Sequence, residues 1–120
     1  MNELGQAWED LACRHLHCAG LELLARNFRT RFGELDLVMR EAGVLVFVEV
    51  RYRARSDYGG AAASVTGSKR ARLGVAAEQF RQQHPALAGL PCRFDVVAIS
   101  GRQPNPRIDW HRAAFDLGGN

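Results

Sequence analysis

Apolar residues recur at helical spacing in two parts of the chain. Residues 3–19 carry the first stripe, which predicts an amphipathic helix with Asn2 as its N-cap and Gly20 at its end. Its apolar positions are Leu4, Trp8, Leu11, Leu16 and Ala19, with Ala7 and Ala12 beside them. A second helix is predicted over residues 66–83, where Leu73, Ala76, Ala77 and Phe80 form the buried stripe.

Strand patterns fill most of the remaining chain. They predict strands at residues 21–30, 33–40, 44–53 and 93–99, followed by a short edge strand at 108–111. A hairpin turn is predicted at residues 41–43, and a loop that contains Gly59 and Gly60 is predicted at residues 54–63. The order αβββαβ, with one further strand, predicts an α/β fold: a mixed β-sheet flanked by helices, with a right-handed crossover through the second helix.

Length and composition indicate a small globular protein. A chain of 120 residues suits a single domain over 1–120, and its 47% hydrophobic and 24% charged residues are typical of a globular protein. The first ten residues are polar and acidic, unlike a signal peptide, and the three cysteines suggest free thiols in a reducing compartment. We therefore expect a cytoplasmic protein. The net charge is +3, and Lys69 is the sole lysine among 16 basic residues.

Two acidic residues interrupt the apolar strands. Asp36 lies in the strand at 33–40 and Glu49 in the strand at 44–53, where an unpaired carboxylate costs several kcal/mol. If Glu41 pairs with Val44 across a two-residue turn, Asp36 lies opposite Glu49, with Cβ atoms roughly 5 Å apart. Carboxylates at that separation suit Mg²⁺ or Mn²⁺. The alternative is a structural network, in which Glu49 pairs with Arg51 or a helix arginine and Asp36 pairs with Arg93.

The same residues resemble a known nuclease motif. Asp36, Glu49 and Arg51 are similar to the D-x(n)-E-x-K core of restriction-endonuclease-like nucleases. The whole chain resembles the bacterial YraN family, which is similar to archaeal Holliday junction resolvases. The matching blocks are Trp8-Glu-Asp-Leu-Ala12, Arg26-Asn-Phe-Arg29, Gly33-Glu-Leu-Asp-Leu-Val38, Val46-Phe-Val-Glu-Val-Arg51, Ser68-Lys69 and Arg93-Phe-Asp-Val-Val97. The resemblance implies a restriction-endonuclease-like core and a metal-dependent endonuclease that hydrolyses DNA phosphodiester bonds.

The resemblance also implies roles for individual residues. Asp36 and Glu49 would bind the metal together with the backbone carbonyl of Val50, and Glu9 would be a further acid, with Glu34 as a helper. The chain departs from the motif at Arg51, which replaces a lysine. An arginine can stabilise the developing phosphate charge, but it does not give up its proton and cannot act as a general base. Either the metal alone lowers the pKa of the attacking water, or another group helps, for which Lys69, near the start of the second helix, is the candidate.

Arginines surround the predicted site in sequence. A phosphate-binding rim is predicted from Arg26, Arg29, Arg31, Arg51, Arg53, Arg55, Arg70 and Arg72. Phe32, Tyr52 and Tyr58 could stack on unpaired bases, although such aromatics are more often packing residues. Branched or single-stranded DNA is therefore the expected partner, and a homodimer is expected from the resolvase resemblance alone. The alternative is a non-catalytic DNA-binding or scaffold protein with a degenerate site, which the arginine at position 51 favours.

Overall fold

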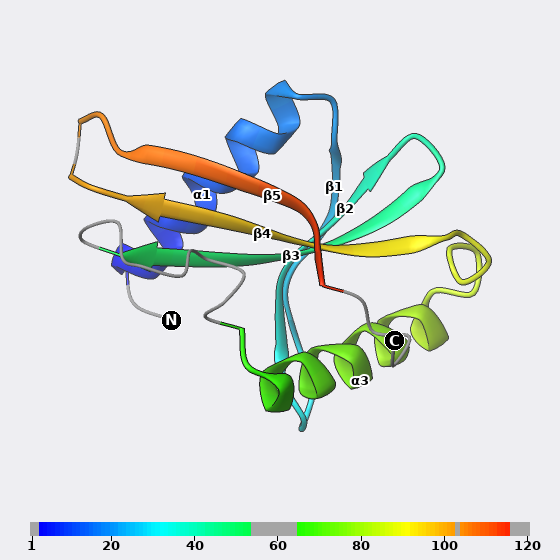
Figure 1. The fold of residues 1–120 in the computed structure, drawn as a ribbon. Helices are drawn as coiled ribbons and strands as arrows, with labels where there is room; N and C mark the ends of the chain where they lie inside the picture. Colours follow the sequence, from blue (N-terminus) through cyan, green and yellow to red (C-terminus); the bar gives the residue numbers. More distant parts are fainter. Residues whose placement is uncertain (1–2, 54–64, 103, 116–120) are drawn as a thin grey trace.

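The computed structural model describes residues 3–53, 65–102 and 104–115, with side chains described from Gly5 onward. These residues form a five-stranded sheet in the order β1-β2-β3-β4-β5, with α1 and α3 packed on its opposite faces (Figure 1). The elements are α1 (Glu3–Cys18), β1 (Glu22–Arg29), β2 (Glu34–Glu41), β3 (Val44–Arg53), α3 (Gly67–Gln83), β4 (Cys92–Ser100) and β5 (Arg107–Phe115). The predicted α/β fold and its order of elements are confirmed.

The sheet is mixed because only one connection crosses over. β1, β2 and β3 are antiparallel neighbours, β3 and β4 run parallel with α3 between them, and β5 returns antiparallel to β4. The predicted hairpin register is also confirmed, since Glu41 pairs with Val44 and the ladder continues to Leu37 opposite Val48. β5 is longer than the predicted 108–111. The predicted loop at 54–63 lies outside the described residues.

Each face of the sheet has its own core. On the α1 face, Trp8, Ala12 and Leu16 pack against strand residues that include Val46 and Val48. On the α3 face, the buried helix residues are Leu73, Ala76, Ala77 and Phe80, as predicted, and they pack against residues that include Leu45 and Phe47. β3 is therefore covered on both sides, which explains its nearly continuous apolar sequence. Ala7 on α1 and Ala19, just after the end of the helix, are exposed rather than part of the stripe.

Two neighbouring strands change face at the same level of the sheet. On β2, Leu37 packs in the α1-side core, whereas Leu35, two residues earlier, packs in the α3-side core. On β1, Arg26 reaches α1 and Phe28 packs against Phe80 of α3. Residues two apart in a regular strand share a face, so both strands rotate here. The rotation lies at Asp36 on β2, which is the position of the predicted acid pair.

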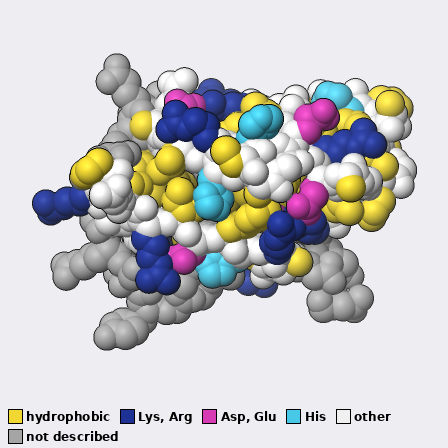
Figure 2. All heavy atoms as spheres, turned by 90° about the horizontal axis from the view of Figure 1, so that it is seen from above, with side chains coloured by type: hydrophobic (Ala, Val, Ile, Leu, Met, Phe, Trp, Pro, Cys, Tyr) yellow, Lys and Arg dark blue, Asp and Glu magenta, His cyan; other side chains and the backbone are white. Residues whose placement is uncertain are grey.

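On the side where α1 lies, the surface carries charged side chains of both signs (Figure 2). The view from above shows basic, acidic and histidine side chains interspersed with apolar ones (Figure 2). Among the described residues, neither helix is long and apolar enough to cross a membrane. A role for the arginines therefore depends on where individual side chains lie, not on the net charge.

Candidate metal centre

Asp36 and Glu49 meet at the point where β2 and β3 separate. The β2–β3 ladder ends at Leu37 and Val48, one step before the two acids. Beyond it, the Asp36 carboxylate accepts a hydrogen bond from the backbone N–H of Val50, with 2.8 Å between Oδ2 and N. In an extended strand the N–H and C=O of one residue point to the same side, so the Val50 carbonyl also faces the β2 side. The hydrogen bond to the Val50 N–H therefore brings the Asp36 side chain beside the backbone of Val50, next to Glu49.

Glu49 lies between two cationic side chains. It is 5% exposed, and its Oε2 lies 2.6 Å from Nζ of Lys69 and 3.3 Å from Nε of Arg51. The Arg51 Nε is buried and makes no hydrogen bond, so its contact with Glu49 is electrostatic only. Neither ion pair uses Oε1 of Glu49. The pairing of Glu49 that the structural alternative requires is present, but Arg93 contacts Glu41 and Asp95 instead of Asp36.

The N-cap of α3 explains how Lys69 reaches the acid. The Thr66 hydroxyl accepts a hydrogen bond from the backbone N–H of Lys69 at 3.2 Å, which fixes the first turn of the helix. Helical side chains point back towards the N-terminus, so the Lys69 side chain extends towards the strands. Lys69 and Arg51 thus bring two positive charges to Glu49 from different elements.

Burial and repulsion make Asp36 retain its proton. Removal from water raises the pKa of Asp36 most, and the nearby Glu49 raises it further through charge and through a hydrogen bond between the carboxyl groups. The hydrogen bond from Val50 opposes this change, but the pKa still reaches about 8. At neutral pH the Asp36–Glu49 pair therefore retains about one proton, whereas two carboxylates in water would retain none. A divalent cation would replace that proton and remove the repulsion.

Glu9 approaches the pair from the opposite side of the sheet. It is 6% exposed, and burial raises its pKa, while hydrogen bonds from Arg26 and Asn27 lower it. Its charge also raises the pKa of Asp36, although less than Glu49 does. Arg26 contacts Oε1 of Glu9 at 3.4 Å and Oδ1 of Asp10 at 2.6 Å. The rotation of β1 and β2 thus lets an acid from α1 and an acid from β3 both approach Asp36.

Asp36 and Glu49 border a small hollow beside the first turn of α3. Its volume is about 290 Å³, and its lining residues are Phe32, Gly33, Glu34, Asp36, Glu49, Lys69, Arg72 and Leu73. Two buried oxygens, Oε1 of Glu34 in the lining and Oδ1 of Asn27 on the adjacent strand β1, have no hydrogen-bond partner. Carboxylate and carbonyl oxygens are the ligands preferred by Mg²⁺ and Mn²⁺. The donor set therefore fits such a cation.

The fit depends on donors other than acidic side chains. Within residues 3–53, 65–102 and 104–115, no group of three or more His, Cys, Asp and Glu side chains is arranged to hold a metal ion. The Asp36–Glu49 pair would need the Val50 carbonyl and water as further ligands. Mg²⁺ commonly keeps several waters and binds through one or two carboxylates, so this requirement agrees with its chemistry.

The predicted arginine rim divides into two groups. Arg29, Arg31, Arg53 and Arg72 are exposed, and Arg72 lines the hollow beside the acids. Arg29 also lies 3.6 Å from Glu34. By contrast, Arg26 is held by Glu9 and Asp10, and Arg55 lies outside the described residues. Arg72 is therefore the exposed arginine of this group that lines the hollow beside the acids.

The aromatic residues also differ in their surroundings. Tyr52 stacks on Trp8 with ring centroids 4.2 Å apart, and its hydroxyl donates to the carbonyl of Gly101 at 2.7 Å. Phe32 is 45% exposed and lines the hollow. Tyr58 lies outside the described residues. Phe32 is therefore the described aromatic side chain placed to meet a base near the acids.

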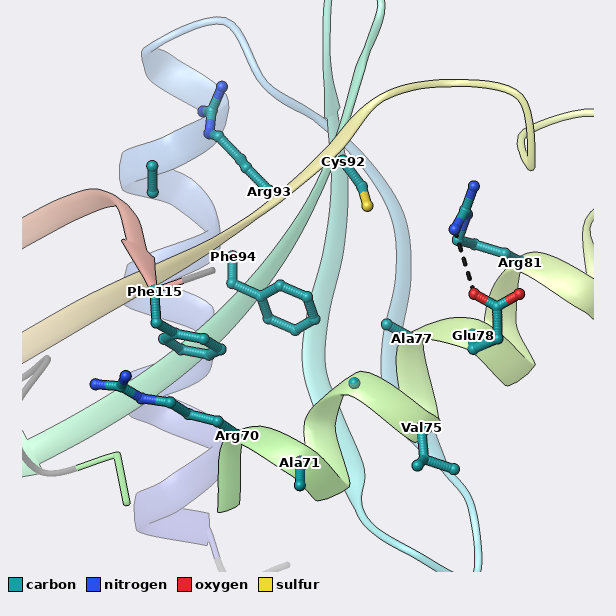
Figure 3. Close-up of a pocket in the computed structure, with 12 residues that line it drawn as sticks. Arg70, Ala71, Val75, Ala77, Glu78, Arg81, Cys92, Arg93, Phe94 and Phe115 are labelled. Atoms are coloured by element: carbon teal, nitrogen blue, oxygen red, sulfur yellow. Dashed lines mark hydrogen bonds and ion pairs between the residues drawn. The ribbon is translucent and has the colours of Figure 1, made fainter. Parts of the chain in front are cut away.

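A larger hollow of about 830 Å³ lies on a different side of α3, next to Phe94 and Phe115 (Figure 3). The arginines around it already have partners within the protein. Arg70 donates to the carbonyl of Val65 and lies 5.2 Å from the centre of the Phe115 ring. Arg81 contacts Glu78 at 3.2 Å. The Arg70 side chain therefore lies on a different side of α3 from the acids. The smaller hollow, which the acids border, is the candidate site.

Sequence reasoning gave no role to Asp95, which is fully buried on β4. Its carboxylate accepts hydrogen bonds from the Arg93 guanidinium, from Nε1 of Trp110 and from the backbone N–H of Ala113. Ala113 has a φ of 49°, and the β4–β5 register shifts between Phe94 and Val96. Asp95 therefore holds an irregular part of β5 against β4. In the sequence, an acidic residue in the middle of an apolar strand is the signal that could have identified Asp95.

The described residues thus define an α/β protein in which the buried Glu49 and the half-buried Asp36 lie together beside two cationic side chains and a small hollow. A model of the uncharacterised protein family UPF0102 matches residues 8–99. The chain belongs to this family, which confirms the family resemblance drawn from the sequence blocks.

Relatives from several bacteria match nearly the full length. A UPF0102 protein of Pseudomonas entomophila is 51% identical over 113 residues, covering 93% of this chain and 92% of the relative. One from Xanthomonas campestris pv. campestris is 55% identical over 113 residues, covering 94% and 91%. One from Ralstonia nicotianae is 56% identical over 117 residues, covering 94% and 86%. The fold described above therefore spans nearly all of the sequence that these relatives share with the chain.

Proposed function

We propose that this protein is a metal-dependent endonuclease that hydrolyses DNA phosphodiester bonds at the Asp36–Glu49 pair. The observation that carries the proposal is the buried Glu49 carboxylate beside Asp36, with Nζ of Lys69 at 2.6 Å from its Oε2. An acid pair with a nearby lysine is the set of side chains that the resemblance to restriction-endonuclease-like nucleases implies. In this chain the lysine comes from α3 instead of from β3.

Each residue has a part in the proposed reaction. Asp36, Glu49 and the Val50 carbonyl would hold Mg²⁺ or Mn²⁺, and the bound cation would supply Lewis acidity and a lowered pKa for water. Lys69 and Arg51 would stabilise the negative charge that develops on the phosphate oxygens. A water molecule adds to phosphorus as one P–O bond breaks, and the leaving oxygen takes up a proton. The products are one end with a phosphate and one with a hydroxyl.

The arginine positions favour recognition of the DNA backbone over recognition of sequence. Arg29, Arg31 and Arg72 are exposed, and Arg72 borders the hollow. Backbone contacts position a protein on DNA without reading bases. Phe32 offers an exposed ring that can stack on an unpaired base, which favours branched or single-stranded substrates. From the resolvase resemblance we also infer a homodimer, since a two-fold substrate suits a two-fold protein.

The second candidate function is non-catalytic binding of DNA. It is favoured by the two ion pairs of Glu49, because Lys69 and Arg51 already compensate its charge without a metal. Metal binding separates the two functions. An endonuclease site binds Mn²⁺ through Asp36, whereas a DNA-binding scaffold binds DNA with the same affinity whether or not Mn²⁺ is present.

The test is cleavage of branched and single-stranded DNA with Mg²⁺ or Mn²⁺. Wild type should cleave, and Glu49→Gln and Asp36→Asn should each lower the rate at least about a hundredfold, in the range found when one charge-stabilising group is removed. Asp10→Asn is the control, because Asp10 is an acid of the same region that pairs only with Arg26 in the described contacts. Equal cleavage by wild type and Glu49→Gln, or none by wild type at saturating protein, would exclude the endonuclease.

A further inference from the structure

Asn27 lies on β1 at the level where both strands rotate. Its φ is 54°, a left-handed conformation that residues other than glycine rarely adopt, with asparagine and aspartate as the most frequent exceptions. The β1–β2 pairing skips it, since Arg26 pairs with Leu37 and Phe28 pairs with Leu35. The residue across from Asn27 in that gap is Asp36. One unusual backbone conformation therefore coincides with the position of the acid pair.

The left-handed conformation changes which side chains face α1. Arg26, before Asn27, reaches Glu9 and Asp10, while Phe28, after it, packs on Phe80. The same change of face occurs on β2 around Asp36, between Leu37 and Leu35. As a result, the charges of two other acids act on Asp36: Glu49 from β3 and, more weakly, Glu9 from α1.

The Asn27 side chain makes a contact with one site acid and leaves one atom without a partner. Its amide group lowers the pKa of Glu9 as a hydrogen-bond donor does, so the amide nitrogen is the group that faces the Glu9 carboxylate. Its Oδ1 is buried and has no hydrogen-bond partner. A buried amide oxygen without a partner is costly, and such an atom near a functional site needs an explanation.

We propose that Asn27 is a positioning residue of the candidate metal site, which holds Glu9 towards Asp36 and offers Oδ1 to the divalent cation or to its water. This inference rests on the proposed function. This role of one residue accounts for three observations together: the left-handed backbone, the amide that faces Glu9 and the buried oxygen without a partner. An amide oxygen is also a hard donor of the type that Mg²⁺ and Mn²⁺ accept.

A purely structural role explains less. Glycine adopts a left-handed backbone without the steric penalty of a side chain, so a position that required only this conformation would be best filled by glycine. Ala42, in the β2–β3 turn, is a useful comparison. Its φ of 52° is almost the same, and it is exposed at the other end of β2 from the acids. Ala42→Gly therefore reports the effect of the backbone change alone.

The experiment compares Asn27→Gly, Asn27→Asp, Asp36→Asn and Ala42→Gly with wild type. Mn²⁺ affinity is measured by calorimetry, and the melting temperature is measured without metal. Asn27→Gly should weaken Mn²⁺ binding by about tenfold or more, as loss of a supporting contact does at other metal sites. Asn27→Asp keeps an oxygen and tolerates the left-handed backbone but loses the N–H donor to Glu9, so it should bind Mn²⁺ more tightly than Asn27→Gly. Ala42→Gly should bind Mn²⁺ as wild type does.

Melting temperatures separate positioning from folding. Asn27→Gly should change the melting temperature by no more than Ala42→Gly does, while its Mn²⁺ affinity falls. Wild-type Mn²⁺ affinity in Asn27→Gly, or equal loss in Asn27→Gly and Asn27→Asp, overturns the inference while leaving the proposed function intact if Asp36→Asn still abolishes binding. Unchanged Mn²⁺ binding in Asp36→Asn overturns the proposed function, and the role of Asn27 then falls with it.

Discussion

Lys69 of α3 places its Nζ 2.6 Å from Oε2 of Glu49 on β3. The motif position on the strand, Arg51, approaches the same oxygen at 3.3 Å without a hydrogen bond from its Nε. The closer cation at Glu49 therefore comes from the helix, and the sole lysine of the chain occupies this position. In the proposed nuclease, Lys69 supplies the ammonium group that the strand lacks.

Loss of Lys69 should lower DNA cleavage, and a lysine at position 51 should restore part of it. Lys69→Met should reduce the rate by about 10²- to 10³-fold, because a charge near the reacting phosphate is removed. Arg51→Lys in the Lys69→Met background should recover about tenfold, since an ammonium group returns to Oε2 of Glu49. Rates under single-turnover conditions with Mn²⁺ provide the measurement.

Arg81→Met is the control for this series. Arg81 lies on the same helix and pairs with Glu78, away from the acids, so its loss should leave the cleavage rate unchanged. If Lys69→Met cleaves like Arg81→Met, Lys69 has no part in the reaction. If the double variant is no faster than Lys69→Met, position 51 cannot supply the ammonium group.

The raised pKa of Asp36 predicts a pH dependence of stability in the metal-free protein. The carboxyl loses its proton near pH 3.8 in the unfolded chain but near pH 8 in the folded protein. The folded state therefore binds more protons between these values, and the free energy of unfolding should fall as the pH rises from about 4 to about 8, by a few kcal/mol. Urea denaturation at intervals across this range measures the change.

Asp36→Asn is the matched variant, because it removes the titrating group with little change of shape. It should flatten most of the fall, with a smaller part remaining from Glu9, whose pKa is raised as well. Mn²⁺ should stabilise wild type more at pH 8 than at pH 6, since the cation competes with the proton for the same oxygens. A slope in Asp36→Asn as steep as that of wild type would show that Asp36 is not the group responsible.

Glu9 and Asp10 offer a neighbouring pair for testing which acid belongs to the site. Both contact Arg26, but Glu9 is 6% exposed and acts on Asp36, whereas the side chain of Asp10 is 46% exposed. Glu9→Gln should lower cleavage by about tenfold or more and weaken Mn²⁺ binding, as loss of a supporting group does. Asp10→Asn should leave both unchanged. Equal effects of the two substitutions would mean that only the contact with Arg26 matters.

The fold could be predicted from sequence because its patterns were local. The stripe at Leu73, Ala76, Ala77 and Phe80 follows helical spacing, and β3 is a long apolar run. The hairpin register followed from the two-residue turn after Glu41. That register, together with the cost of burying a charge, was enough to bring Asp36 and Glu49 together. The part of the site that depends on neighbouring strands could therefore be predicted from the sequence.

Contacts between distant elements could not be predicted in the same way. The rotation at Asn27 and Asp36 breaks the alternation on which a strand prediction depends, so the approach of Glu9 rested on the family resemblance alone. The longer β5 was missed because Ala113 has a left-handed backbone and is held by a side chain from β4. Such a contact leaves no periodic signal in the sequence of β5.

Asp95 should contribute strongly to stability and not to metal binding. Its buried carboxylate accepts hydrogen bonds from Arg93, Trp110 and Ala113, and Asp95→Asn replaces one acceptor oxygen with a donor group facing other donors. We expect a loss of about 3–5 kcal/mol in the free energy of unfolding, as for other broken buried ion pairs. Trp110→Phe removes one donor and should cost about 1–3 kcal/mol. Chemical denaturation measures both, and Mn²⁺ affinity measured at low temperature should match wild type.

The exposed arginines near the hollow should determine DNA affinity through the phosphate backbone. Arg72 lines the hollow beside Lys69, whereas Arg40 lies at the other end of β2 and donates to the carbonyl of Ala42. Arg72→Glu should weaken DNA binding and lower the slope of affinity against salt by about one phosphate contact. Arg40→Glu makes the same change of net charge at a distance. If both variants lose affinity equally, the effect comes from net charge, and the rim beside the acids has no specific part in binding.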